Sequence, residues 1–179
     1  MESFEGKSLF LNRSDINTDE IIPARYLTEI SKQAMGPHLL EDLVLPGFNP
    51  TSDVPDKGVL VTRANFGCGS SREHAAWALE VNDINVVIAE SFSRIFRQNM
   101  FNCGMLAAPL PPETIDHIFE TFADRETHVE TDLEQNMFVF TAKDRDGKEI
   151  REEIPFTLGE FDRELLEAGG WVNYADSRY

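Results

Sequence analysis

Cysteine is scarce in this chain, and so are the features that would mark a secreted or membrane protein. Cys68 and Cys103 are the only cysteines among 179 residues, which is too few for a disulfide scaffold and is typical of a protein in a reducing cytoplasm. No apolar run approaches the roughly 20 residues that a membrane span requires. Residues 1–5 are acidic and precede no apolar stretch, so we do not expect a secretory signal.

Basic residues are also in short supply. The chain carries 16 Lys and Arg against 32 Asp and Glu, a formal net charge of −16. This charge disfavours nonspecific binding to nucleic acid or to an anionic membrane, because the long-range field repels phosphate. A site for a small anionic substrate would therefore need local cations and oriented backbone amides. The hydrophobic content of 41% beside 27% charged residues is typical of a globular protein.

The order of the expected elements indicates the fold class. Residues 59–108 alternate strand, helix, strand, helix and strand, which predicts parallel strands with right-handed crossovers. Farther along, Asp146-Gly147 between two strand patterns predicts an antiparallel hairpin. The expected strands are 7–11, 59–62, 85–89, 105–108, 137–142 and 149–156, and the expected helices are 37–43, 71–81, 92–102, 113–123 and 158–168. We therefore predict one compact α/β domain over residues 1–179, with a mixed sheet or barrel-like core flanked by helices.

Residues 24–55 form a long, weakly structured segment inside this otherwise regular pattern. It contains the short helical candidate 37–43 and several turn signals around Pro46-Gly47 and Asn49-Pro50. A segment of this length with little regular structure is more often a functional loop than a neutral connection. We therefore predict that it is a functional loop.

The most informative stretch is the glycine-rich turn at 65–74. Gly67 and Gly69 bracket Cys68 between a strand and a helix, which allows a sharp turn and a close approach of the backbone to a ligand. The start of the following helix would present unpaired amides and a partial positive charge. Two serines add hydroxyls there, and Arg72 is able to grip a carboxylate through two parallel hydrogen bonds. The turn therefore predicts a site for a carboxylate or phosphate, with a serine beside it.

The turn does not match more specific catalytic or phosphate-binding motifs. A phosphate-binding P-loop needs a lysine after its spacer, and no lysine lies between Lys57 and Lys143. A nucleophile elbow needs a glycine where Arg72 stands. A hydrolase dyad of Cys68 and His74 has no other feature to support it. The plain structural alternative is that the serines cap the helix while Arg72 pairs with a surface acid.

The same residues resemble a known family. Residues 65–80 are similar to the signature of the swivelling domain of the aconitase superfamily, in which the turn reads Gly-Ser-Ser-Arg-Glu-His, as it does at 69–74. The likeness continues through 89–96 and 99–104, and it includes 17–27 near the start. Together these segments span about half of the chain in the order of the family.

The resemblance implies a role for each residue of the turn. Ser70 corresponds to the serine that acts as an alkoxide-like base and removes the substrate proton. Ser71 and Arg72 correspond to positions that hold a substrate carboxylate, and Asp19 corresponds to an acid that supports the serine site. The physical chemistry agrees, because a serine becomes basic enough only when amide dipoles and a guanidinium stabilise its anion.

The resemblance also implies a cofactor that this chain is not expected to hold. Family enzymes dehydrate a hydroxy acid with a [4Fe–4S] cluster, whose open iron binds the leaving hydroxyl, and the cluster needs three cysteines. Cys68 and Cys103 are too few and show no ligand spacing. We therefore expect no cofactor and no metal on this chain. The cluster is expected on a large catalytic subunit, with which this chain would form a heterodimer or heterotetramer.

The substrate is suggested by the segment after Arg25. Small subunits that resemble homoaconitase carry an arginine just after Tyr-Leu, whereas Thr28 and Glu29 stand there in this chain. An inward-pointing Glu29 would repel an additional carboxylate, so a dicarboxylate with an uncharged side group is favoured. Lys32 would alter this conclusion if it reached the site. Arg25 and Thr28 are both expected to contact the substrate.

The family resemblance thus implies the small subunit of a hydro-lyase that isomerises 2- and 3-isopropylmalate during leucine biosynthesis and is active only with its large subunit. A related substrate remains open, namely homoaconitate, citraconate or dimethylmalate. An alternative hypothesis, from a different functional class, is that the chain is a stand-alone anion-binding module. Co-purification with a cluster-bearing chain would separate the enzyme reading from the module.

Overall fold

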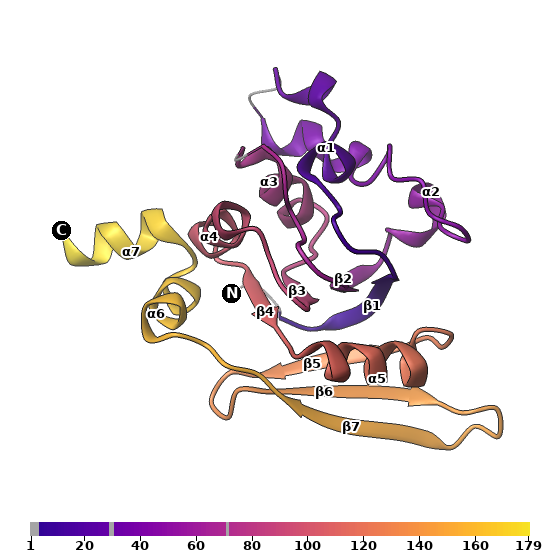
Figure 1. The fold of residues 1–179 in the computed structure, drawn as a ribbon. Helices are drawn as coiled ribbons and strands as arrows, with labels where there is room; N and C mark the ends of the chain where they lie inside the picture. The colour runs from indigo at the N-terminus through magenta and orange to yellow at the C-terminus, as the bar shows by residue number, and fades with distance from the viewer. Residues whose placement is uncertain (1–3, 29–30, 71) are drawn as a thin grey trace.

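In the computed structural model, which describes residues 4–28, 31–70 and 72–179, the chain forms a seven-stranded sheet in the order β4-β3-β2-β1-β5-β6-β7 (Figure 1). The pairs β1–β2, β2–β3 and β3–β4 are parallel. The pairs β1–β5, β5–β6 and β6–β7 are antiparallel. The strands are β1 (Gly6–Leu11), β2 (Lys57–Thr62), β3 (Val86–Ala89), β4 (Leu106–Pro109), β5 (His128–Asp132), β6 (Met137–Lys143) and β7 (Glu149–Pro155). The mixed sheet predicted from the sequence is confirmed.

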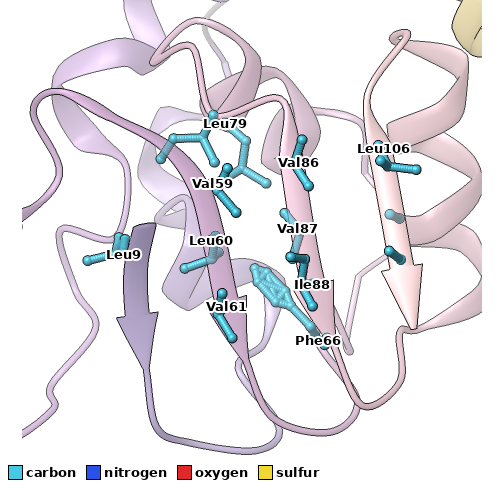
Figure 2. Packing of buried hydrophobic residues seen from close by; sticks show 14 of the residues in the cluster. Leu9, Val59, Leu60, Val61, Phe66, Leu79, Val86, Val87, Ile88 and Leu106 are labelled. Atoms are coloured by element: carbon cyan, nitrogen blue, oxygen red, sulfur yellow. The ribbon is translucent and has the colours of Figure 1, made fainter. Parts of the chain in front are cut away.

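The parallel half holds the centre of the core. Val59, Leu60 and Val61 of β2 are fully buried, and Figure 2 shows them beside Val86 and Ile88 of β3. Strands buried on both faces are typical of parallel sheets covered by helices. Those helices are α3 (His74–Glu80) and α4 (Arg94–Asn102), which form the crossovers β2–α3–β3 and β3–α4–β4. The parallel order inferred from the strand–helix alternation is correct.

Helix α5 (Pro112–Phe122) joins the parallel and antiparallel halves. The ring of Phe119 packs edge-on against Phe10 of β1 at 5.7 Å, and the ring of Phe122 lies 5.3 Å from Phe140 of β6. One helix thus contacts strands from both halves, and the sheet curls around it (Figure 1). The barrel-like core expected from the sequence takes the form of this curled sheet.

The antiparallel half was predicted only in part. Asp144 accepts backbone hydrogen bonds from Asp146 and Lys148, and Gly147 has φ +81°, so the hairpin between β6 and β7 forms where its Asp-Gly signal predicted. Strand β5 was not predicted, because His-Val-Glu-Thr-Asp offers a single buried apolar side chain, Val129. Pairing with β1 and β6 makes it a strand, and this information is not local to its sequence.

Residues 24–55 contain more regular structure than the sequence predicted. The described elements around and within this segment are α1 (Thr18–Ile21), η1 (Ala24–Tyr26), η2 (Lys32–His38) and α2 (Pro50–Asp53), where η marks a 3₁₀ helix. The predicted helix at 37–43 is wrong, since the helical turns lie earlier. Leu40 has a left-handed backbone with φ +59°, which no α-helix accommodates, and its amide donates to the Ile21 carbonyl at 2.8 Å.

The chain ends in two helices. Helix α6 (Glu160–Ala168) stops at Gly169, whose φ of +83° caps it as the Gly-Gly signal predicted. Helix α7 (Trp171–Arg178) was not predicted, and Figure 1 shows it extending away from the sheet. Across the described ranges, no helix combines the length and the apolar character needed to cross a bilayer.

Candidate functional site

The glycine-rich turn lies where three parallel strands end. On one side the Gly67 amide donates to the Ile16 carbonyl, at 2.8 Å, and the Thr18 amide donates to the Cys68 carbonyl, at 2.9 Å. On the other side the amides of Phe66 and Ser93 bond to the carbonyls of Ser91 and Phe66, at 3.1 and 3.0 Å. The turn is therefore held between the segments that follow β1 and β3. Ligands of open α/β sheets bind at this end of the strands.

The two glycines of the turn are required by their surroundings. Gly67 has φ +81°, and a Cβ there would stand 2.2 Å from Cγ of Phe96, so any side chain would displace a buried ring. Gly69 has φ +98° and lies over α1, since its Cβ would meet Thr18 Oγ1 at 3.5 Å. The sharp turn and close approach predicted from the sequence are both present. Ser70 is the next residue along the chain.

Asp19 and Arg72 meet in one small hollow. The hollow has a volume of about 10 Å³ and is lined by Thr18, Asp19, Ile22, Leu27, Arg72 and Ala75. Asp19 comes from α1 and Arg72 from the turn before α3, so the fold joins residues that are distant in sequence. The hollow places a carboxylate and a guanidinium beside three apolar side chains. At about 10 Å³ the hollow has room for about one water molecule, so it marks where these residues converge.

Local contacts fix α1 and hence Asp19. The Asn17 side chain accepts from the Glu20 amide at 2.9 Å, and Glu20 Oε1 accepts in return from the Asn17 amide at 3.2 Å, which completes a capping box. Arg13 Nη2 also donates to Glu20 Oε1, at 2.6 Å. Burial raises the pKa of Glu20, but the bonds from Arg13 and Asn17 together hold it below its usual range. Glu20 is therefore ionised at neutral pH and anchors the helix.

The start of α3 differs from the prediction. The sequence indicated a helix from Ser71, whereas α3 begins at His74, so Arg72 precedes the helix. Glu73, the capping residue, makes no side-chain cap bond, and Ser71 lies outside the described residues. The alternative in which the serines cap the helix is therefore not what the described residues show, because the capping position is Glu73.

Ser70 and Arg72 are both open to a ligand. Ser70 is half-buried and Arg72 is exposed. Within the described ranges neither side chain takes part in a hydrogen bond or an ion pair with another described residue. The alternative in which Arg72 pairs with a surface acid is thus not what the described residues show. Arg72 retains its donors for an incoming anion.

The thiol of Cys68 is not activated as a nucleophile. Burial raises the pKa of its thiol, and the nearby Asp15 carboxylate raises it further, so the thiol stays protonated at neutral pH and is a poor nucleophile. The His74 ring packs against Trp77, with centroids 4.8 Å apart. These observations argue against a hydrolase dyad of Cys68 and His74.

The cysteines also do not fit an iron–sulfur cluster. Among the described residues one group of three metal-ligating side chains occurs, Glu5, His128 and Glu130, and it contains neither Cys68 nor Cys103. A [4Fe–4S] cluster is held by cysteine thiolates, of which this chain offers too few.

The predicted substrate-selecting residues lie on the surface beside the hollow. Arg25 is bound to Glu41 and Asp42, and Thr28 is exposed one residue beyond Leu27. Glu29 lies outside the described residues. Lys32 does not reach the hollow: its Nζ bonds Glu80 at 2.9 Å and stands over the ring of Trp77.

Sequence reasoning missed the apolar wall of the hollow. Ile22, Leu27 and Ala75 line it beside Asp19 and Arg72. Leu27 carried a usable signal, because it is an apolar residue directly after the candidate Arg25-Tyr26 pair. Ile22 and Ala75 carried none, since buried apolar residues on short helices are ordinary core positions.

Comparison with known proteins extends these observations. Residues 1–113 match the model of the aconitase C-terminal domain. A 3-isopropylmalate dehydratase small subunit from Novosphingobium aromaticivorans is 39% identical over 152 residues, covering 84% of this chain and 74% of that protein. Another, from Leptospira interrogans, is 32% identical over 197 residues, covering 93% of this chain and 95% of that protein.

A solved structure agrees over nearly the whole length. The crystal structure of 3-isopropylmalate dehydratase from Methanocaldococcus jannaschii has a TM-score of 0.75 and 30% identity, and the match covers 98% of this chain and 94% of that chain. Both Asp19 and the turn at 65–74 fall inside the segment that matches the domain model.

Proposed function

This chain belongs to the aconitase C-terminal domain family and, within it, to the 3-isopropylmalate dehydratase small subunits, and on that basis we propose that it is half of a hydro-lyase that interconverts 2- and 3-isopropylmalate in leucine biosynthesis. We further propose that residues 1–179 act as one swivelling domain, with 24–55 as its substrate-selecting loop. The observation that supports this most is the hollow lined by both Asp19 and Arg72, of which Arg72 stands two residues after Ser70 in the chain. Its apolar wall suits an isopropyl group beside a carboxylate.

The proposed mechanism gives each residue of this chain one task. Arg72 holds a substrate carboxylate through two parallel hydrogen bonds, and Ser71 adds its hydroxyl to the same carboxylate. Ser70, as the alkoxide, removes the proton from the carbon that carries hydrogen. The electron pair of that C–H bond becomes the double bond as the hydroxyl leaves the adjacent carbon. Addition of water with the opposite orientation then gives the isomer.

The serine anion needs stabilisation that the turn is built to provide. A serine hydroxyl is a weak acid, so its anion requires nearby positive potential. The free guanidinium of Arg72 is two residues away, and Asp19 lines the hollow with it. We propose that Arg72 supplies this positive potential, and that Asp19, which in the described part of the chain bonds to neither Ser70 nor Arg72, supports the site by accepting a hydrogen bond from Arg72 when the substrate binds.

The remaining chemistry belongs to a partner. We propose a large subunit that carries the [4Fe–4S] cluster and takes the leaving hydroxyl, because Cys68 and Cys103 do not fit a cluster here. The small-subunit names of the relatives support such a partner. Whether the complex is a heterodimer or a heterotetramer follows from its mass in solution.

Reconstitution tests this proposal directly. The isolated chain is expected to bind no stoichiometric iron after anaerobic reconstitution and to be inactive, because it lacks a third cysteine. Mixed with a cluster-bearing large subunit, it is expected to isomerise isopropylmalate. Iron analysis, light scattering and assays on isopropylmalate, homoaconitate, citraconate and dimethylmalate provide the readouts. A cluster on this chain alone, or preferred turnover of another substrate, would contradict the proposal, and an anion-binding chain that joins no large subunit would favour the module.

A substitution at Thr28 is expected to shift the substrate preference. Thr28→Arg places a cation beside the apolar wall, where isopropylmalate presents methyl groups. An unpaired buried charge costs up to several kcal/mol, so kcat/KM for isopropylmalate falls. A substrate with a carboxylate at that position, such as homoaconitate, pairs with the arginine, so its kcat/KM rises.

Thr51→Arg serves as the control, because Thr51 is also exposed and lies elsewhere in the loop. It should leave the ratio of the two kcat/KM values unchanged. If Thr28→Arg lowers both values equally, the loop is merely damaged. If it changes neither, Thr28 does not face the substrate.

A further inference from the structure

The guanidinium of Arg25 is ion-paired with two carboxylates, those of Glu41 and Asp42. Its Nη1 donates to Asp42 Oδ2 at 2.8 Å, and its Nη2 donates to Asp42 Oδ1 at 3.0 Å and to Glu41 Oε2 at 2.8 Å. Paired donors on one carboxylate are the most directional ion pair that arginine forms. The guanidinium that the sequence suggested for the substrate is therefore already engaged by the protein itself.

Aromatic contacts reinforce this arrangement. The Tyr26 hydroxyl donates to Glu41 Oε2 at 2.8 Å, and the Tyr26 ring stacks on His38 with centroids 3.7 Å apart. The Tyr26 hydroxyl bond lowers the pKa of Glu41, and the Arg25 bond lowers the pKa of Asp42. Both carboxylates are thus ionised at neutral pH. We call Arg25, Tyr26, His38, Glu41 and Asp42 the clasp.

The acidic side of the clasp is anchored in the core. Leu39, Leu40 and Leu43 are buried, with 3%, 0% and 4% of their surface exposed. The Leu40 amide bonds to the carbonyl of Ile21, the last residue of α1. The segment 38–43 therefore moves with α1, which carries Asp19. The clasp ties η1 to that fixed base.

The residue that follows the clasp reaches the site. Leu27 comes directly after Tyr26 and lines the hollow with Asp19 and Arg72. At about 10 Å³ the hollow has room for about one water molecule, whereas ligand pockets measure at least roughly 300 Å³. A substrate therefore needs one wall to give way. Of the three apolar wall residues, Leu27 alone is half-buried, whereas Ile22 and Ala75 are 2% and 1% exposed.

We propose that Arg25 is a positioning residue, which through the clasp sets the place of Leu27 over Asp19 and Arg72, and that it does not itself bind the substrate. The link to catalysis rests on the function proposed above. Exposed ion pairs contribute little to global stability one by one. Loss of the clasp is therefore expected to change how often the segment adopts its competent position, while the fold persists.

Two variants approach the clasp from opposite sides. Arg25→Gln removes the cation, and the double variant Glu41→Gln with Asp42→Asn removes its acceptors. If the clasp positions the segment, both raise KM by roughly tenfold, as expected when the competent fraction falls to about a tenth, with kcat nearly unchanged. The triple variant is expected to have the same KM as either of these variants, because both disrupt the same clasp.

The alternative makes the opposite forecast. If Arg25 grips the substrate, Arg25→Gln is severe, while loss of Glu41 and Asp42 is harmless or beneficial because it frees the guanidinium. That outcome, or no effect of either variant, would overturn the proposal. The charge exchange Arg25→Asp with Asp42→Arg should restore much of the KM, which a substrate-binding arginine would not permit. Arg151→Gln is the matched control, since Arg151 is 51% exposed against 55% for Arg25 and pairs with Glu153 on β7.

Hydrogen exchange on the isolated chain tests the clasp without reference to any reaction. The amides of Tyr26 and Leu27 bond to the carbonyls of Pro23 and Ala24 at 3.0 and 3.1 Å. Millisecond labelling with mass spectrometry should show faster exchange at these amides in Arg25→Gln, and no change in Arg151→Gln. Unchanged exchange in Arg25→Gln would refute the clasp. An inactive wild-type complex would instead count against the proposed function, and the exchange result would still stand.

Discussion

Replacing Ser70 with alanine is expected to lower kcat by about a thousandfold or more, with the fold and the subunit assembly intact. A general base contributes roughly 10²–10⁴ to the rate, and alanine leaves nothing that can take the proton. Ser70 is half-buried and makes no hydrogen bond to another described residue, so its loss leaves no orphaned partner among them. The measurement is steady-state turnover of the reconstituted complex, with circular dichroism and light scattering to verify folding and assembly.

Ser91→Ala is the matched control for this variant. The Ser91 hydroxyl accepts a hydrogen bond from the Asn65 amide at 2.8 Å, so its removal loosens the same turn without touching the proposed base. A loss of about 0.5–1.5 kcal/mol in stability is expected there, with turnover largely retained. If Ser70→Ala loses only a few-fold of activity, or Ser91→Ala loses as much as Ser70→Ala, Ser70 is not the base.

Replacing Arg72 with lysine is expected to reduce kcat/KM by about 10- to 100-fold, mainly through KM. Lysine keeps the charge but loses the planar fork that meets both oxygens of a carboxylate. One charge-assisted hydrogen bond is worth about 1.5–3 kcal/mol, which corresponds to this range. Arg72 lines the hollow with Asp19 and has no ion-pair partner among the described residues, so the whole loss falls on ligand binding.

Two further variants test whether the effect of Arg72→Lys comes from the loss of the guanidinium at the site. Arg72→Gln, which removes the charge as well, should be more severe than Arg72→Lys. Arg145→Lys makes the same exchange on the exposed hairpin turn and should leave the kinetics unchanged. A KM for Arg72→Lys equal to that of the wild type would show that the guanidinium does not hold the substrate.

The parts of the fold that the sequence predicted well are those with local causes. Continuous β-branched runs in β2 and β3 fill both faces of a covered sheet. The Asp-Gly turn between β6 and β7 needs only its own backbone preferences. Strand β5 and helix α7 are among the elements that escaped prediction. They draw their stability from neighbouring elements, so their own residues carry little signal. The wrong helix at 37–43 failed because the left-handed Leu40 serves a contact with α1.

The amino-acid sequence by itself determined the chemistry that this protein is able to carry. Gly67, Gly69, Ser70 and Arg72 predict an anion-binding turn without coordinates, since the steric freedom of glycine and the planar donor pair of arginine are properties of the residues. The count of two cysteines predicts for the same reason that a cluster would be held by another chain.

The tertiary structure decided which of these groups work together. Asp19 meets Arg72 only because β1 and β2 are neighbouring parallel strands, so the segments that follow them emerge side by side. Arg25 was available to the substrate as far as the sequence went, and the fold engages it with Glu41 and Asp42 instead. Lys32 likewise pairs with Glu80 on α3. A charged side chain pairs with the opposite charge that the fold places nearest to it. The distance between two charges that are far apart in sequence cannot be predicted from any local sequence pattern.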